Sequence, residues 1–305
     1  MTHTTSHHIH IAAILTCFNR KEKTLSCLRH LYHALSQDDT TALTVYLTDD
    51  GCTDGTADAV RNQFPDKDIH ILQGTGSLYW AGGMIFAWKE ALKQRDAYDF
   101  YLLLNDDSFV KDNVFKELYA AHAFSLQTYG MAGIYSGVTC DPNDESLITY
   151  GGGVYENASR SKIRELKPTG QPQMVDKTNA NILLVSRQVV DSVGIFYDGY
   201  IHSGPDFDYS LVVRKAGFPA LITANVCGTC EFDHTSDADI CEKLRHMTLK
   251  ERIAYLDNPL HREHDYLVFV KRHNPKKYPV TWMLHKIRRY CPSIYLFINR
   301  RRGLY

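Results

Sequence analysis

The sequence predicts an α/β fold with a mainly parallel central sheet and flanking helices, followed by a helical, basic C-terminal extension. Short apolar runs alternate with stretches of helical periodicity through the first part of the chain, which is typical of a parallel sheet. With 305 residues, 44% of them apolar, the chain can bury a large core. We expect a disordered N-terminus at residues 1–8, the α/β domain at 9–235 and the extension at 236–305.

The elements follow from the period of the apolar residues and from the caps and turns between them. Strands are expected at residues 9–16, 43–48, 69–72 and 100–104, followed by helices at 21–36, 54–64, 80–93 and 111–127. After short Tyr- and Gly-rich strands from residue 132, we expect a strand at 181–185, helices at 187–193 and 207–216, and a strand at 220–226. Beyond residue 234 the pattern becomes helical and is punctuated by prolines.

Acidic pairs follow two of the predicted strands at their carboxyl ends, where parallel sheets bind ligands. Asp49 and Asp50 can accept hydrogen bonds from a ribose hydroxyl or a base N–H. Asn105, Asp106 and Asp107 offer the hard oxygen ligands that suit Mg²⁺ or Mn²⁺ bridging a diphosphate. Turns and helix caps are the alternative for each cluster taken alone. Two clusters at neighbouring strand ends together indicate a nucleotide diphosphate site.

Six short motifs occur in an order that resembles glycosyltransferase family 2, over roughly residues 9–235. They are TCFNR at 16–20, DDGCTDGT at 49–56, GSLYWAGG at 76–83, NDD at 105–107, NILLVSR at 181–187 and DFDYSL at 206–211. Each motif is weak alone, but six in sequence order are specific. Within the family, the chain is similar to bacterial rhamnosyltransferases and galactofuranosyltransferases.

The resemblance implies a GT-A fold and an inverting transfer of a hexosyl or deoxyhexosyl unit from a UDP- or dTDP-sugar. The acceptor would be a hydroxyl of a saccharide or lipid-linked molecule in bacterial surface polysaccharide biosynthesis. By position, it assigns donor binding to Thr16, Phe18, Arg20, Asp49, Asp50, Gly76, Trp80 and Asp106. It assigns the Mg²⁺ or Mn²⁺ ion to Asp107, Asn105 and His234, although Asn105 stands where many relatives have the stronger ligand Asp.

Asp206 matches the catalytic base of the family, at the start of a helix that faces the sugar. A carboxylate there can accept the proton of the acceptor hydroxyl as the new bond forms. Pro205 stands where many relatives have another acid, so Asp208 and His202 are the alternative bases. A helix-capping role for Asp206 is compatible with catalysis.

Two other classes share the expected sheet. A sugar nucleotidyltransferase normally has a glycine-rich, basic loop after its first strand, whereas residues 16–20 contain no glycine. A non-catalytic binding protein with the GT-A fold would be expected to lose a carboxylate from one of its acid sites, and all three sites remain here.

Charge is unevenly distributed along the chain. The total of 34 Lys and Arg against 35 Asp and Glu argues against a nucleic acid partner. From Tyr266 to Tyr305, however, the sequence has ten Lys and Arg and no acid. Met283, Ile287, Tyr290 and Ile294 recur there near helical spacing, so this tail could dock on anionic lipid. Packing on the catalytic domain, or on another subunit of a homo-oligomer, is the alternative.

The sequence also indicates a compartment. It has no apolar stretch of about 20 residues and no secretory leader, and its eight cysteines are scattered. We therefore expect a cytoplasmic protein, with the tail as a route to peripheral attachment on the inner face of the membrane.

Overall fold

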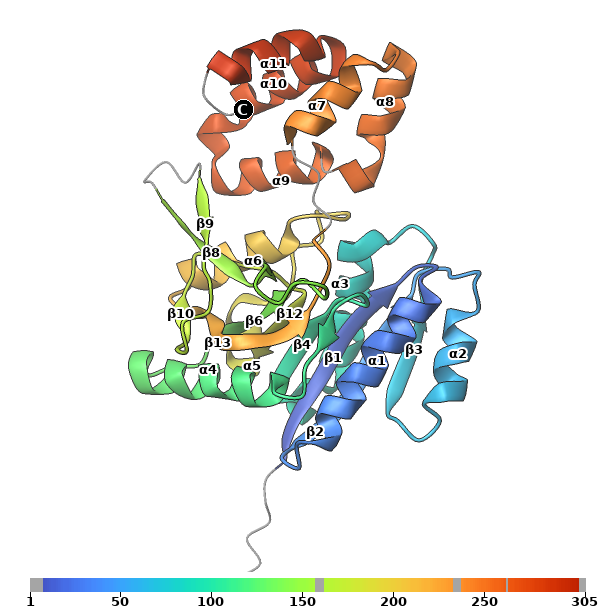
Figure 1. Cartoon of the computed structure of the whole chain (residues 1–305), viewed down its shortest axis with the longest axis vertical. Helices are drawn as coiled ribbons and strands as arrows, with labels where there is room; N and C mark the ends of the chain where they lie inside the picture. The colour runs from blue at the N-terminus through green and yellow to red at the C-terminus, as the bar shows by residue number, and fades with distance from the viewer. Residues whose placement is uncertain (1–7, 157–161, 233–236, 262, 302–305) are drawn as a thin grey trace, which may run out of the picture.

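A computed structural model describes residues 8–156, 162–232, 237–261 and 263–301 (Figure 1). Its first half alternates strands and helices as predicted. The elements are β1 (Ile9–Cys17), α1 (Lys21–Ser36), β2 (Thr41–Asp49), α2 (Thr56–Gln63), β3 (Ile69–Gln73), α3 (Tyr79–Ala91), β4 (Phe100–Leu104), β5 (Phe109–Val110) and α4 (Val114–Tyr129). The predicted N-terminal disorder falls almost wholly on residues 1–7, which lie outside the described residues.

The second half contains most of the short strands. Its elements are β6 (Ile134–Cys140), β7 (Ile148–Tyr150), β8 (Gly152–Tyr155), β9 (Ile163–Glu165), β10 (Gln173–Met174), β11 (Lys177–Thr178), β12 (Ile182–Ser186), α5 (Arg187–Val193), α6 (Pro205–Lys215) and β13 (Ala220–Thr229). Strands β11, β8 and β9 form a small sheet of their own.

The main sheet has the strand order β10-β13-β6-β12-β4-β1-β2-β3. Strand β1 pairs in parallel with both β2 and β4, and β2 pairs in parallel with β3. Strand β12 runs antiparallel to β4 on one side and to β6 on the other. The predicted α/β fold is confirmed. Within the sheet, β12 is antiparallel to both of its neighbours, and the short strands β5, β7 and β10 also pair antiparallel.

Helices cover both faces of the sheet, so its central strands are buried on both sides, as parallel strands are. In β1, Ile11, Ala13 and Leu15 belong to an apolar cluster that includes residues of α1 and α4. The intervening Ala12 and Ile14 belong to a second cluster with residues of α3 and α6. This continuous apolar run holds the polar turns after β1, β2 and β4 at one edge.

The C-terminal extension is a helical bundle at one end of the molecule (Figure 1). It contains α7 (Asp237–Arg245), α8 (Leu249–Asp257), α9 (Glu263–His273), α10 (Tyr278–Tyr290) and α11 (Pro292–Arg301). Thr248 and Glu251 form a capping box that starts α8. The boundary that we predict at 235/236 lies outside the described residues. Among the helices described, none combines the length and the hydropathy needed to cross a membrane.

Candidate functional site

The sheet brings the predicted turns together because β1, β2 and β4 end at the same edge. Cys17 at the end of β1 is in register with Asp49 at the end of β2. On the other side, Ile14 is in register with Leu103, close to the acidic turn that follows β4. The donor-site residues predicted on these three strands are therefore neighbours.

Asp50 holds the loop that leads into α3. One of its carboxylate oxygens accepts a hydrogen bond from the Gly76 amide at 2.8 Å, and the other accepts from Leu78 and Tyr79 at 2.8 and 3.0 Å. A Cβ at Gly74 would lie 2.6 Å from Asp50 Oδ1, so this approach requires glycine. Asp50 thus has a structural role that the sequence did not reveal, and its nucleoside contact stays a prediction, as does that of Gly76.

Asp49 has a freer carboxylate than Asp50. Its Oδ1 accepts a hydrogen bond from the Cys52 amide at 2.7 Å, and the Cys52 thiol is a second partner of the same carboxylate. Asp49 accepts from one backbone amide, whereas Asp50 accepts from three, so Asp49 has more capacity left for a nucleoside N–H or hydroxyl.

The end of β1 combines a buried hydroxyl with an exposed ring. Thr16 donates from its hydroxyl to the Thr48 carbonyl at 3.4 Å and lies so close to α3 that a Cβ at Gly83 would come within 2.1 Å of its Oγ1. Phe18 is 53% exposed. Asn19 takes a left-handed conformation, with φ 50°, and its side chain accepts from the Thr53 amide at 2.7 Å. An exposed aromatic face beside these polar turns is suited to stacking on a base.

Arg20 bridges the two adjacent acids of the β4 turn. It donates to Asp107 at 2.8 Å and to Asp106, which also accepts from the Thr24 hydroxyl at 3.1 Å. Asp106 is 1% exposed. Burial raises its pKa to about 6 against the opposing charge of Arg20, and the neighbouring Asp107 adds to the rise. The two acids are therefore neutralised largely by one guanidinium.

The residues of the β4 turn fit a metal that a diphosphate shares. Asp107 keeps 21% of its side chain exposed. The Asn105 amide oxygen accepts from the Trp80 indole at 2.8 Å. Among the described residues, no group of three or more His, Cys, Asp or Glu could hold a metal, and His234 lies outside them. Mg²⁺ is usually bound by one or two carboxylates together with substrate phosphates, and Asp107 provides such a carboxylate.

Asp206 lies in the first turn of α6, after a left-handed Gly204 and the N-terminal Pro205. Its carboxylate accepts from the Phe207 amide at 2.9 Å and from the Ala180 amide at 3.4 Å. Burial raises the pKa of Asp206 to about 6, against the Phe207 amide and the positive charge of Lys177. The residue as a whole is partly exposed, while its carboxyl group is buried among protein atoms. It is a buried carboxylate with a raised pKa at the start of a helix.

The start of β12 connects Asp206 to the acidic turn. The Asn105 amide donates to the Asn181 carbonyl at 3.1 Å, and the preceding residue, Ala180, donates to Asp206. The structure thus brings the predicted base to the same edge as the predicted donor and metal residues.

The alternative base Asp208 is fully engaged elsewhere. It is 2% exposed and accepts from Arg272 Nε at 2.6 Å, from His273 Nε2 at 2.6 Å and from the Tyr200 hydroxyl at 3.0 Å. Burial alone would raise its pKa, but His273 and Arg272 hold the pKa of Asp208 below its ordinary value. The other alternative, His202, lies edge-on to Tyr79 with 6.4 Å between ring centroids.

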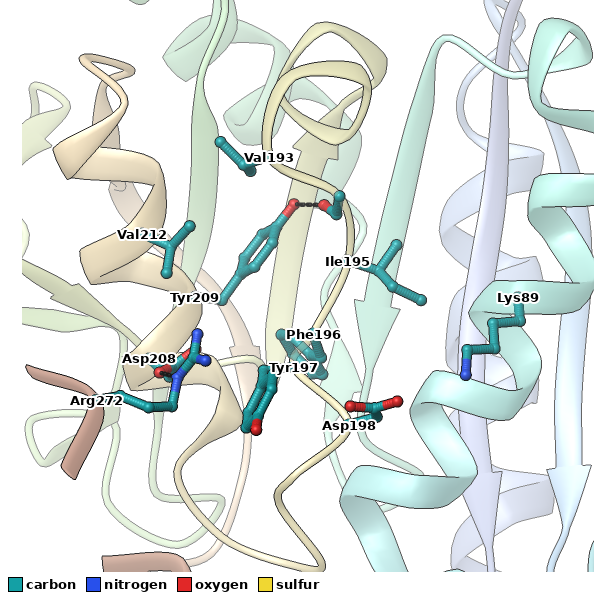
Figure 2. A pocket seen from close by; sticks show the side chains of 11 residues that line it. Lys89, Val193, Ile195, Phe196, Tyr197, Asp198, Asp208, Tyr209, Val212 and Arg272 are labelled. Carbon is teal, nitrogen blue, oxygen red and sulfur yellow. Dashed lines mark hydrogen bonds and ion pairs between the residues drawn. The ribbon is translucent and has the colours of Figure 1, made fainter. Parts of the chain in front are cut away.

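A cavity of about 360 Å³ lies between α6, α3 and the loop that joins α5 to α6. Figure 2 shows Arg272 beside Asp208 at one side of it and Lys89 at the other. Apart from Asp208, no residue proposed from the sequence for binding or catalysis lines this cavity. It is separate from the strand-end site.

A family model described as "Glycosyltransferase like family 2" matches residues 7–249, which is more than half of the chain. The protein belongs to this family of glycosyltransferases. A search of curated proteins found no match.

Solved structures agree with this family in fold. S. aureus TarS 1–349 in complex with UDP is 13% identical, with a TM-score of 0.54, over 97% of this chain and 93% of that one. GalNAc-T7 with UDP, GalNAc and Mn²⁺ is 14% identical, with a TM-score of 0.54, over 87% of this chain and 50% of that one. At these identities the likeness shows the fold alone.

In this glycosyltransferase, the sequence did not predict that α9 contacts the segment that carries Asp206. Asp265, Arg272 and His273 all contact the segment around the start of α6. One signal was present in the sequence, because Asp265 is the last acidic residue before the basic tail. It is also seven residues from Arg272, which places the two on one face of a helix.

Proposed function

We propose that the protein transfers a hexosyl or deoxyhexosyl unit, with inversion, from a UDP- or dTDP-sugar to a hydroxyl of a saccharide or lipid-linked acceptor. The observation that carries the proposal is the position of Asp206, a carboxylate with a raised pKa that is tied through Ala180 and Asn181 to the acidic turn of β4. Family membership supports the reaction class, and the resemblance to bacterial transferases supports a role in surface polysaccharide assembly.

The donor side of the site is built from the three strand ends. Phe18 offers a face for the base, and Asp49 offers an acceptor for a nucleoside N–H or hydroxyl. Arg20 can turn from Asp106 and Asp107 toward the diphosphate, since its side chain is partly exposed. TarS with UDP-GlcNAc and GalNAc-T7 with UDP and Mn²⁺ support a uridine nucleotide and a divalent metal.

Asp206 would act on the acceptor. Its carboxylate takes the proton of the attacking hydroxyl, while Lys177 favours the ionised form and the first turn of α6 orients the oxygens. Asp107, with Asn105 and His234 as further candidates, would hold Mg²⁺ or Mn²⁺, which supplies charge stabilisation for the departing diphosphate.

A screen of nucleotides by thermal shift tests the donor class. UDP or dTDP at about 100 times its Kd should stabilise the protein by about 2.7 kcal/mol, which for a chain of 305 residues corresponds to a rise in Tm of roughly 4 °C. We expect the rise with Mn²⁺ or Mg²⁺ and little of it with EDTA. The stabilising sugar nucleotide is then given candidate acceptors, and NMR of the product reports the anomeric configuration. If no sugar nucleotide stabilises the protein with either metal, the proposal is wrong.

We also propose that the C-terminal bundle attaches the enzyme to the anionic, cytoplasmic face of a membrane. Large apolar side chains on α10 and α11 are about half exposed, and basic groups lie over two of the rings, Lys286 over Trp282 and Arg301 over Phe297. The exposed apolar residues of the two helices are Val280, Trp282, Met283, Tyr290, Ile294 and Phe297. Their mixture with cations suits an anionic lipid surface. Eight free cysteines support a reducing compartment.

Vesicle sedimentation tests the attachment. The protein should bind vesicles that contain phosphatidylglycerol, should bind pure phosphatidylcholine much less, and should be released as salt is raised. The double change Lys286→Gln and Arg301→Gln should weaken binding about 30-fold, because each charge near the surface contributes about 1 kcal/mol. Lys116→Gln with Lys215→Gln removes the same charge from the catalytic domain and should have little effect. Equal binding to both lipids would favour a subunit interface.

A further inference from the structure

Helix α9 of the C-terminal bundle contacts the segment before α6 through a buried acid. Asp265 is 2% exposed, and its carboxylate accepts hydrogen bonds from three consecutive amides. The amides are those of Ile201, His202 and Ser203, at 2.9, 2.8 and 2.7 Å. A carboxylate bound to three backbone N–H groups fixes the direction of the chain at that point.

The same helix holds the other side of Asp206. Two turns along α9, Arg272 and His273 reach Asp208 on α6. The spacing of seven residues from Asp265 to Arg272 places both on one face of α9, about 10 Å apart along its axis. Arg272 also stacks on Tyr197, with its guanidinium carbon 3.8 Å from the ring centroid. Figure 2 shows this contact, with Arg272 between Asp208 and Tyr197.

The chain from Ile201 to Asp208 is thus held on both sides of Asp206. At one end, Ile201 also accepts through its carbonyl from the Ala81 amide of α3 at 3.2 Å. At the other end, the Tyr200 hydroxyl donates to Asp208 within the cluster. The Asp206 carboxylate accepts hydrogen bonds from the Phe207 and Ala180 amides, the second of them 3.4 Å long, and the Asp206 carbonyl accepts from the Ser210 hydroxyl within α6. Its place therefore depends on the segment that carries it.

We propose that Asp265 and Arg272 are positioning residues for Asp206, so that the C-terminal bundle forms part of the catalytic apparatus. The inference rests on the proposed function, since it takes Asp206 as the base. Removing Asp265 leaves three partly buried amides without this acceptor, and the segment relaxes toward solvent to satisfy them. A displacement of the base by about 1 Å can reduce turnover 100-fold. Most of the predicted donor residues lie at the ends of β1, β2 and β4 rather than on this segment, so donor binding should change much less than turnover.

The test compares two acids on α9. Asp265→Ala should lower kcat for nucleoside diphosphate release by about 10- to 100-fold. Glu263→Ala is the matched control, because Glu263 is also buried but pairs within the bundle, with Arg289 at 2.7 Å. At a temperature where both variants are folded, Glu263→Ala should keep kcat within about threefold. Both should bind UDP with Mn²⁺ as the unmodified protein does. Equal losses of kcat in the two variants would overturn the proposal.

A second pair of variants changes Arg272 and Lys271, which are exposed positions of α9 where a substitution carries less risk of unfolding the protein. Arg272→Gln should lower kcat about three- to tenfold, because His273 and Tyr200 still hold Asp208. Lys271→Gln removes the same charge from the exposed neighbouring position and should leave kcat unchanged. A loss of kcat in Arg272→Gln that is matched by an equal loss of UDP affinity would contradict a positioning role.

Hydrogen exchange separates this inference from the proposed function. Amides of residues 198–204 and of Asp206 should exchange faster in Asp265→Ala than in Glu263→Ala, whether or not a donor is turned over. If the unmodified protein releases no nucleoside diphosphate from any donor, the proposed function fails. In that case, the hydrogen-exchange comparison alone tests whether Asp265 holds the segment before α6. Unchanged exchange in Asp265→Ala would overturn the inference even if transfer were demonstrated.

Discussion

Asp206→Asn is expected to lower turnover by about 10²- to 10⁴-fold while donor affinity and Tm barely change. The acceptor hydroxyl is a poor nucleophile until its proton has an acceptor, and asparagine cannot take that proton. The amide is the same size as the carboxylate and can still accept from the Phe207 amide, so the start of α6 keeps its structure. Steady-state kinetics with the donor and acceptor found by screening, together with calorimetric binding of UDP, measures the two effects separately.

The pH dependence of kcat/KM provides a second test of Asp206 as the base. Burial raises the pKa of Asp206 to about 6, and the base works only when it is ionised. We therefore expect kcat/KM to be level above pH 6 and to fall about tenfold per pH unit below it. This limb should vanish in Asp206→Asn. Asp198→Asn, which changes an exposed acid in the loop before α6, is the control and should keep both rate and profile. Near-normal turnover in Asp206→Asn would exclude Asp206 as the base.

Asp107→Ala should remove the metal dependence of donor binding. We expect the affinity for UDP in Mn²⁺ to fall on the order of 100-fold, to the level seen in EDTA, because Asp107 is the exposed carboxylate of the acidic turn. Fold stability should change little, since the partner of Asp107 is Arg20, which also binds Asp106. Titration calorimetry with and without Mn²⁺ measures the difference.

The matched control for this variant is Asp112→Ala. Asp112 lies five residues along the chain and is well exposed. It should leave both the UDP affinity and its metal response intact. An Asp107→Ala protein that still binds UDP more tightly in Mn²⁺, by the normal factor, would remove Asp107 from the metal site.

Element positions with clear apolar periodicity could be predicted from the sequence. The bounds expected for the helix at 21–36 and the strand at 100–104 are those of α1 and β4. Boundaries set by tertiary pairing were missed. Strand β13 continues to Thr229 because Gly228 and Thr229 pair with both β5 and β6. Helix α4 starts at Val114 rather than at residue 111 because the Lys111 amide bonds the Cys227 carbonyl of β13. The side chains of these paired residues do not indicate from the sequence that the pairing forms.

Some features of the candidate site could likewise be predicted from the sequence, whereas others could not. Motif order led to the acidic turns and to Asp206, which the sheet then brings to one edge. It did not reveal that Asp50 bonds the loop before α3, or that Asp265 bonds the loop before α6. Both contacts join a carboxylate to backbone amides far along the chain. Amides are present at nearly every position, so residue types cannot identify which of them will be partners.

The reversed direction of β12 separates the segment that borders Asp206, along the chain, from the strands that carry the predicted donor residues. Because β12 is antiparallel to β4, its beginning lies at the donor edge, where Ile182 is in register with Leu104. The chain that enters β12, rather than the chain that leaves it, therefore borders Asp206. Insertions, deletions or substitutions between β6 and β12 can remodel that border without shifting the register of β1, β2 and β4. Under the proposed function, such changes would alter the acceptor side of the site while the predicted nucleotide-binding residues keep their places.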